Sequence, residues 1–278
     1  MTSSMTSSMT SSTTSSPPPR DAPPPAPDSQ RLGGIGWARS SGGRLSRSER
    51  ARLLAAIAHG QWQNALGRAK LAIGTLPAGA ESVDLDTFVV PDSSFAREAE
   101  QACAELPAAL VGHSYRTWLF GLALAAVDRS ELDAELFYCG SLLHDHGIAA
   151  PTPGRDFTLA GAERTLECAA SAGVDEDRAE MLADAICVHT TPGIATERDG
   201  ALGCYLQWGA MVDGAGLRVW DIAPQNVAEI VQRHPRDDFK RQLVAMVRAE
   251  AAAVPRGRFG LLVRCGLPLA VRMAPFAS

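Results

Sequence analysis

Apolar stretches with helical spacing are the strongest constraint on the fold, because three of them carry polar side chains that would be costly to bury alone. His113 begins HSYRTWLFGLALA, the pair His144-Asp145 ends LFYCGSLLHD, and Asp213 ends LQWGAMVD. A lone imidazole or carboxylate in such a stretch would lose its hydration without gaining a partner. If the four side chains converge on one cation, the cation offsets that cost. Nitrogen and oxygen ligands without thiolate suit zinc, iron or manganese.

Each of these residues also has a simpler interpretation. A histidine in an apolar helix is often a hydrogen-bonded core residue, and a His-Asp dipeptide occurs by chance in many chains. Asp213 could cap a helix that ends near Gly214 and Gly216. The order of the set favours a metal centre: a histidine on one helix, His-Asp at the end of the next, and an aspartate on a later one.

That ordered set resembles the HD superfamily of metal-dependent hydrolases. The strings VPDSSFAREAE, HSYRTWLFGLALA, ELFYCGSLLHDHG and AICVHTTPGIA are similar to its cyanamide-hydratase-like branch, over roughly residues 88–235. In that branch a proline-aspartate-serine segment and a short acidic helix precede the first histidine. A serine and then an arginine follow that histidine, and here they are Ser114 and Arg116.

The resemblance implies an all-α HD-domain bundle that binds one divalent ion, zinc first, with iron or manganese as alternatives. The expected ligands are His113, His144, Asp145 and Asp213. Neighbouring residues in the middle of a helix point about 100° apart. One ion can therefore reach both His144 and Asp145 only near a helix end, which Gly147 is expected to supply.

The activity that the resemblance implies is the addition of metal-activated water to a small nitrile, cyanamide, which gives urea. Asp145 would accept a proton, and His189 would line the substrate pocket and donate one. His189 could instead bind a second ion or be a surface residue at a helix end. Arg116 is a further candidate for contact with the substrate.

Two other functions stay open. A phosphohydrolase acting on nucleotides or small phosphomonoesters would need cationic side chains near the ion, for which Arg116 and Arg155 are candidates. The segment HDHGIA has no lysine after the aspartate, as some cyclic-dinucleotide phosphodiesterases of the superfamily would have. The third function is a catalytically silent, metal-binding regulatory module that uses residues 1–50 to bind a partner.

Two positions depart from the family's pattern. His146 follows the His-Asp pair, where relatives usually carry an aliphatic residue. It is expected on the surface at the negative end of its helix, with a place near the site as the alternative. Ala160 stands where relatives often have an acidic residue, so no extra carboxylate is expected from that segment.

Composition divides the chain into an arm and a domain. Residues 1–47 are expected to form a disordered arm, in which a Ser/Thr repeat runs into prolines by residue 30 and a basic, glycine-rich linker follows. Residues 48–278 are expected to form one helical domain with its core at about 88–235.

Helices are predicted over most of that domain. The first begins at Ser46 or Ser48 with Glu49 in its first turn, and a short one stops before Pro107. VDLDTFVV at 83–90 is the only strand candidate, with an extended lead-in as the alternative, and the C-terminal segment 255–278 is left unassigned. The remaining helices are expected at 109–127, 131–146, 158–172, 175–190, 199–216, 224–234 and 236–252.

Charge and cysteine content limit the partners and the compartment. The net charge is −5; residues 1–50 hold six Arg against three acids, which is +3, so the remainder carries −8 and does not favour nucleic acid. The six cysteines form no C-x-x-C pair and are expected to be buried thiols in a reducing compartment. No segment approaches the roughly 20 apolar residues of a membrane span. The expectation is a cytoplasmic protein with a small-molecule substrate and neither a membrane nor a nucleic-acid partner. A homo-oligomer stays open.

Overall fold

The computed structural model describes residues 28–277, and within that range it contains thirteen α-helices, three short 3-10 helices and no strand. The all-α prediction is therefore confirmed for this part of the chain. The helices are α1 (Ile35–Ser41), α2 (Arg47–Ala72), α3 (Ser94–Ala104), α4 (Ala108–Asp128), α5 (Ala134–Leu143), α6 (Thr158–Ala172), α7 (Glu176–Val188), α8 (Thr196–Asp199), α9 (Ala201–Ala215), α10 (Pro224–Arg233), α11 (Phe239–Ala253), α12 (Arg258–Arg264) and α13 (Leu267–Arg272).

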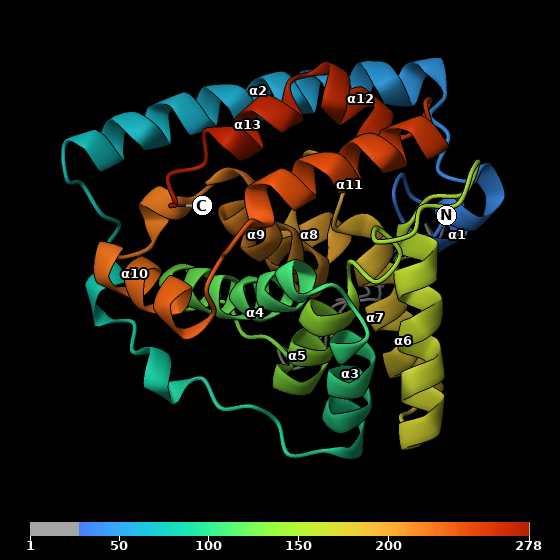
Figure 1. Cartoon of the computed structure of the whole chain (residues 1–278), viewed down its shortest axis with the longest axis horizontal. Helices are drawn as coiled ribbons and strands as arrows, with labels where there is room; N and C mark the ends of the chain where they lie inside the picture. The colour runs from blue at the N-terminus through green and yellow to red at the C-terminus, as the bar shows by residue number, and fades with distance from the viewer. Residues whose placement is uncertain (1–27, 278) are drawn as a thin grey trace, which may run out of the picture.

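The centre of the bundle is the pair α4 and α9, with α5 and α7 beside it (Figure 1). Glycine allows this pair to approach closely. A Cβ at Gly209 would overlap the main-chain oxygen of Thr117, and one at Gly121 would overlap the ring of Phe137. The close approach fixes the first turns of α4 against the last turns of α9, where two of the predicted site residues lie.

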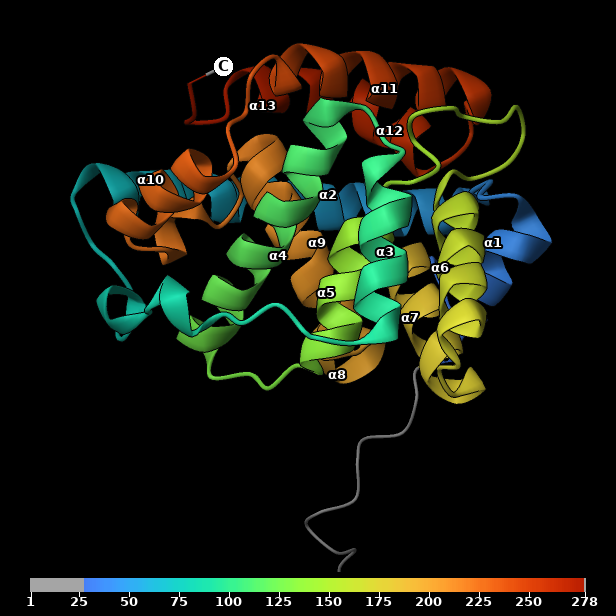
Figure 2. The ribbon, with the colours of Figure 1, turned by 60° about the horizontal axis from the view of Figure 1, so that its bottom comes forward.

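The C-terminal helices form a layer across one end of this bundle. Figure 2 shows α11, α12 and α13 together above α4, α5 and α9. The sequence predicted a helix at 236–252, left residues 255–278 unassigned and placed the core at about 88–235, but Leu261 and Val271 are buried in the same core. The domain therefore extends past residue 235.

Local sequence signals set most helix ends. Ser46 and Glu49 form a reciprocal capping box at the start of α2, and Asp175 caps α7. The helix predicted at 199–216 corresponds to α9, which begins after Gly200, whose φ is 83°; the short helix α8 before it was not predicted. The strand candidate at 83–90 is wrong, because that segment contains the 3-10 helix Leu85–Thr87.

The predicted arm divides into two parts. Residues 1–27 lie outside the described residues, so their predicted disorder is untested. Residues 28–47, predicted to be part of a disordered arm, instead pack against α7 and α8. Arg31 forms ion pairs with Asp184 at 2.7 Å and Asp199 at 2.9 Å, and Trp37 of α1 is buried. Two buried carboxylates that need a cation explain this docking.

Deletion of residues 1–43 should lower the free energy of unfolding by several kcal/mol, because it leaves Asp184 and Asp199 buried without Arg31. Deletion of residues 1–27 alone removes a Ser/Thr- and Pro-rich segment with little apolar surface, and should leave the melting temperature unchanged. Thermal unfolding of the two truncated proteins beside the full chain checks this. Equal melting temperatures for both would contradict a packed segment 28–43.

The described helices were also compared with the requirements of a bilayer span. Among residues 28–277 no helix combines the length and the hydropathy needed to cross a membrane. All six cysteines are free thiols; five are buried, and Cys265 is half-buried.

Candidate metal centre

Four buried polar side chains face one another where α4, α5 and α7 meet. His113 lies in the second turn of α4, while His144 and Asp145 follow the last residue of α5 and His189 follows the last residue of α7. Their exposed fractions are 3%, 0%, 5% and 4% in that order. Because α5 ends at Leu143, the backbone is free to turn both His144 and Asp145 toward the same point, as the sequence predicts.

His113, His144 and Asp145 form the metal-capable group. The Nε2 atoms of His113 and His144 each lie 3.5 Å from Oδ2 of Asp145, and one ligand atom from each of the three residues lies within 4.8 Å of the others. On the other side of the carboxylate, Nε2 of His189 lies 3.8 Å from Oδ1 of Asp145. This spacing leaves room for a cation between the three.

The second ring nitrogen of each histidine has an acceptor of its own. Nδ1 of His144 donates to the Ser141 carbonyl oxygen at 2.9 Å, and Nδ1 of His189 donates to the Ile186 carbonyl oxygen at 2.5 Å. Such acceptors hold the proton on Nδ1 and leave Nε2 with a free lone pair. Within residues 28–277 no protein atom hydrogen-bonds to the buried Nε2 of His144. An orphaned buried nitrogen beside a carboxylate is what a divalent ion would satisfy, so the residues fit one.

The charge states of the group suit a cation as well. Burial lowers the pKa of His144 to about 3, so the ring is neutral near pH 7. Burial by itself would raise the pKa of Asp145, but the imidazoles of His144, His189 and His113 outweigh it and hold the pKa below its ordinary value. Neutral imidazole and ionised carboxylate are the forms that bind metals.

No known family model matches this chain. A search of curated proteins also finds no match. These comparisons therefore assign no family to the chain.

Asp213 differs from its predicted role as a direct ligand. Its carboxylate is fully buried on α9, where Oδ2 accepts from Nδ1 of His113 at 2.7 Å. Arg116 donates to both of its oxygens at 2.9 and 3.0 Å, and Arg236 donates to Oδ1. Both of its oxygens accept these hydrogen bonds, so Asp213 lies behind His113 and orients its ring. It also lies inside α9, not at its cap.

Arg116 does not have the substrate contact predicted for it. Its side chain is fully buried, and besides Asp213 it donates to the main-chain oxygens of His234 and Pro235 at 3.0 and 2.9 Å. Arg236 completes the same cluster, and sequence reasoning missed it. An arginine in the polar string HPRDDF gives no sign that it will be buried.

Replacement of Asp213 by asparagine should lower the free energy of unfolding by about 3–5 kcal/mol, because two buried guanidinium groups lose their counter-charge. Ion affinity should fall by about 10–100-fold, the usual cost of removing a residue that orients a ligand. Chemical denaturation and ion titration measure the two effects. The exposed ion pair of Asp92 and Arg97 provides the control, since Asp92→Asn should change neither quantity. Complete loss of the ion in Asp213→Asn would instead indicate a direct ligand.

A second buried cluster supports His189 from behind. Arg258 of α12 donates to the Cys187 carbonyl oxygen and to Oγ1 of Thr191, at 2.6 and 2.8 Å, and forms an ion pair with Asp156 at 2.8 Å. On the other side, Nε2 of Gln207 donates to the main-chain oxygens of His189 and Thr191. These contacts fix the chain on both sides of His189. Sequence reasoning missed them because α12 was unassigned.

Glu250 lies next to this cluster and makes stability depend on pH. Burial, followed by the nearby charge of Asp156, raises the pKa of Glu250 from 4.5 to about 7. A raised carboxyl pKa means that the folded state holds the proton more tightly. Its stabilising effect is therefore complete below pH 4.5 and is lost as the pH rises to about 7, by about 3 kcal/mol. Glu250→Gln should remove this slope in pH-dependent denaturation, whereas the exposed Glu180→Gln should retain it.

The other predicted residues lie away from the group. His146 is half-buried, and its Nε2 lies 3.8 Å from the Glu105 carboxylate. Its position is therefore closer to the expected surface position than to a place in the site. Arg155 is exposed and forms an ion pair with Glu163.

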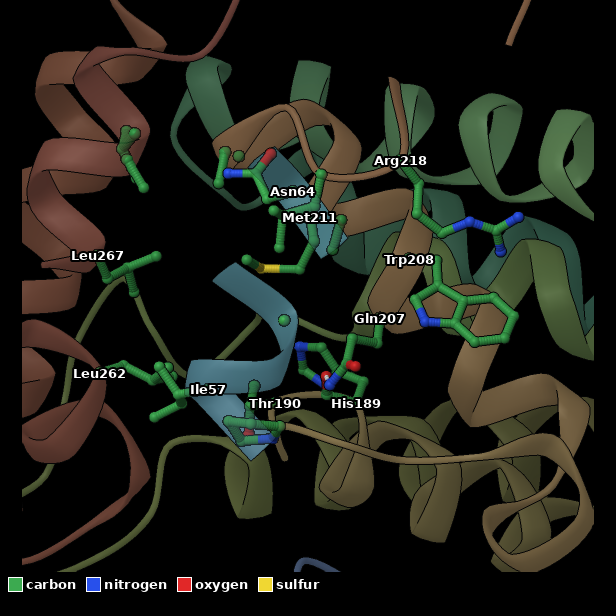
Figure 3. A pocket seen from close by; sticks show the side chains of 18 of the residues that line it. Ile57, Asn64, His189, Thr190, Gln207, Trp208, Met211, Arg218, Leu262 and Leu267 are labelled. Carbon is green, nitrogen blue, oxygen red and sulfur yellow. Dashed lines mark hydrogen bonds between the residues drawn. The ribbon is translucent and has the colours of Figure 1, made fainter. Parts of the chain in front are cut away.

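A cavity of about 330 Å³ opens from the metal-capable group. His113, Asp145 and His189 line one end of it. His189 therefore lies at a cavity, and its contact with a substrate stays a prediction. Figure 3 shows Thr190 and Gln207 beside His189, with Met211 projecting into the space from α9. Helix α2 lies on one side of the cavity, and the helices α11, α12 and α13 supply another wall.

Proposed function

We propose that the protein is a metal-dependent hydratase of the HD superfamily, which adds water to the carbon–nitrogen triple bond of a neutral nitrile. Cyanamide, converted to urea, is the simplest such substrate. The observation that carries the proposal is the group of two imidazoles and one carboxylate, with His189 beside it, at one end of a largely apolar cavity. Zinc is the proposed ion, because a compact set of imidazole nitrogen and carboxylate oxygen suits it.

His113, His144 and Asp145 would hold the ion, with Asp213 orienting His113. A bound divalent ion lowers the pKa of water from about 15.7 toward about 7. Asp145 is positioned to accept the proton that water gives up, and His189 is positioned to receive it from Oδ1, 3.8 Å away. His189 then donates the proton to the nitrile nitrogen.

The atoms balance in this scheme. The oxygen of water forms a bond to the nitrile carbon, and one carbon–nitrogen π bond is lost. The first proton reaches nitrogen through Asp145 and His189. The second moves from oxygen to nitrogen when the adduct rearranges to the amide, so both hydrogens of water end on nitrogen.

The charges in the cavity favour a neutral substrate over a phosphate ester. Of the described residues, Arg218 is the only arginine or lysine among those that line the cavity. It is held by Asp128 and Asp221 through three hydrogen bonds of 2.8 to 3.0 Å to their carboxylates. Arg116 is bound to Asp213 and faces away. A phosphate group, which needs free cationic donors, therefore has no matching partner here.

Metal analysis followed by parallel assays tests the proposal. Purified protein should contain about one ion per chain, should release urea from cyanamide, and should lose that activity on treatment with a chelator. Release of phosphate from mononucleotides without urea formation would instead support a phosphohydrolase. A bound ion with turnover of neither substrate would support a regulatory module.

A further inference from the structure

The cavity beside the metal-capable group is much larger than cyanamide needs. Its volume is about 330 Å³. One water molecule occupies about 30 Å³ in the liquid, so the cavity has room for roughly ten non-hydrogen atoms. Cyanamide consists of a single carbon between two nitrogens and would leave most of this space unfilled. Cavities of this size usually bind larger organic ligands.

The wall away from the ion is apolar. Leu243 and Val247 of α11, Leu262 of α12 and Leu267 of α13 contribute to it, with Met211 of α9 and Ile57 of α2 completing the surface. Figure 3 shows Leu262 and Leu267 close to Ile57, and Met211 pointing into the space beside them. Such a wall offers no hydrogen bond to a polar group. Displacement of water from it by a hydrocarbon favours binding.

Two of the polar residues that line the cavity, Asn64 and Arg218, already have partners, and the others from α2 (His59, Gln61 and Gln63) are exposed to solvent. The amide oxygen of Asn64 accepts from Arg68 at 3.3 Å, and Arg218 is paired with Asp128 and Asp221. Neither therefore requires a polar group on the ligand. The far end of the cavity can accept a hydrocarbon without leaving these groups unpaired.

An unpaired hydroxyl lies at the other end. Thr190 follows His189 and lines the cavity, and within residues 28–277 its buried Oγ1 has no hydrogen-bond partner. A buried hydroxyl without a partner costs free energy unless a ligand supplies one. The nitrogen of a nitrile, or the amide that forms from it, can supply that partner beside the ion.

We propose that the substrate is a neutral nitrile or substituted cyanamide whose apolar alkyl or aryl arm fills the cavity lined by Met211, Leu262 and Leu267. This inference rests on the proposed hydratase function and specifies its substrate class. For a substituted cyanamide, R–NH–C≡N and water give R–NH–CO–NH₂. The oxygen bonds to carbon, both carbon–nitrogen π bonds of the nitrile are lost, one carbon–oxygen π bond forms, and both hydrogens of water end on the former nitrile nitrogen.

A series of substrates whose apolar arms increase in length tests the inference. Each buried methylene should raise kcat/KM by about fourfold. N-butylcyanamide should therefore exceed cyanamide by about a hundredfold, and N-benzylcyanamide should do so as well. Binding of N-benzylurea to chelator-treated protein, measured by calorimetry, should persist, because the arm contacts side chains and not the ion.

One variant and a matched control test whether the cavity causes the preference for substrates with an apolar arm. Met211→Trp fills the space and should remove the preference for the benzyl compound, measured as the ratio of kcat/KM for N-benzylcyanamide to kcat/KM for cyanamide. It should also abolish binding of N-benzylurea. Met181→Trp replaces an exposed methionine on α7, outside the cavity, and should change none of these values.

The results separate this inference from the function on which it rests. Turnover of cyanamide with no gain from a longer arm, or with an equal gain in Met211→Trp, would overturn the substrate class and leave the hydratase proposal intact. Absence of turnover on every nitrile in the metal-loaded protein would overturn both. We expect kcat/KM to rise with the length of the arm in the wild-type protein and in Met181→Trp. We expect no such rise in Met211→Trp.

Discussion

Replacement of Asp145 by asparagine should remove both the ion and the activity. Asp145 is the only carboxylate among the three residues of the metal-capable group in the described chain. The amide keeps the shape but loses the charge that attracts a divalent ion, and it cannot accept the proton of water. Turnover should fall to background, and the ion should be absent after purification.

The same variant should remain folded, which distinguishes a lost site from a lost structure. The imidazoles hold the pKa of Asp145 below its ordinary value, so loss of the charge should lower the melting temperature of the ion-free protein, but the isosteric amide should leave the helical content by circular dichroism unchanged. Wild-type protein should gain about 2.7 kcal/mol of stability at an ion concentration 100 times the dissociation constant, and Asp145→Asn should gain none. A metal-loaded, active variant would show that Asp145 has neither role.

Replacement of His189 by glutamine should lower turnover by about 10²–10⁴ and leave the ion bound. That loss is the usual contribution of a general acid or base. The structure favours this outcome over direct binding, because the ligand atoms of His113, His144 and Asp145 form the compact group and His189 lies 3.8 Å from the far oxygen of Asp145. Metal content and steady-state turnover, both measured on this variant, check the prediction.

Two other outcomes are distinguishable. If His189 binds a second ion, metal content should fall and excess metal should restore activity. If it has no part in catalysis, neither quantity should change by more than a few-fold. His146→Gln is the matched control, since His146 is half-buried, lies near Glu105, and should tolerate the change without loss of ion or turnover.

The helices themselves were largely predictable, because their signals are local. The period of apolar residues gives α6 at 158–172 with both ends correct, and Ser46 with Glu49 marks the start of α2. A helix depends mainly on neighbours three and four residues away, so the sequence contains what is needed. The helix α8 was missed, since its four residues are too few for a periodic pattern.

Part of the candidate site was predictable for a different reason. His113, His144 and Asp145 are polar residues inside apolar helical segments, and burying them separately would be costly. Their convergence follows from that cost. Asp213 carries the same signal, yet the structure gives it a different role. Whether a buried carboxylate meets an ion or a guanidinium group depends on residues far along the chain, here Arg116 and Arg236.

The sequence by itself determined the all-α class, most helix ends and three members of the metal-capable group, because propensity, capping and the cost of burial are properties of short segments. Tertiary structure alone decided the rest. Residues 28–43 were predicted to be a linker from composition, but Arg31 meets Asp184 and Asp199, more than 150 positions away, and is drawn into the fold. The apolar cavity likewise requires α2, α9 and the C-terminal helices to meet in space, and no local pattern encodes where packed helices leave a gap between them.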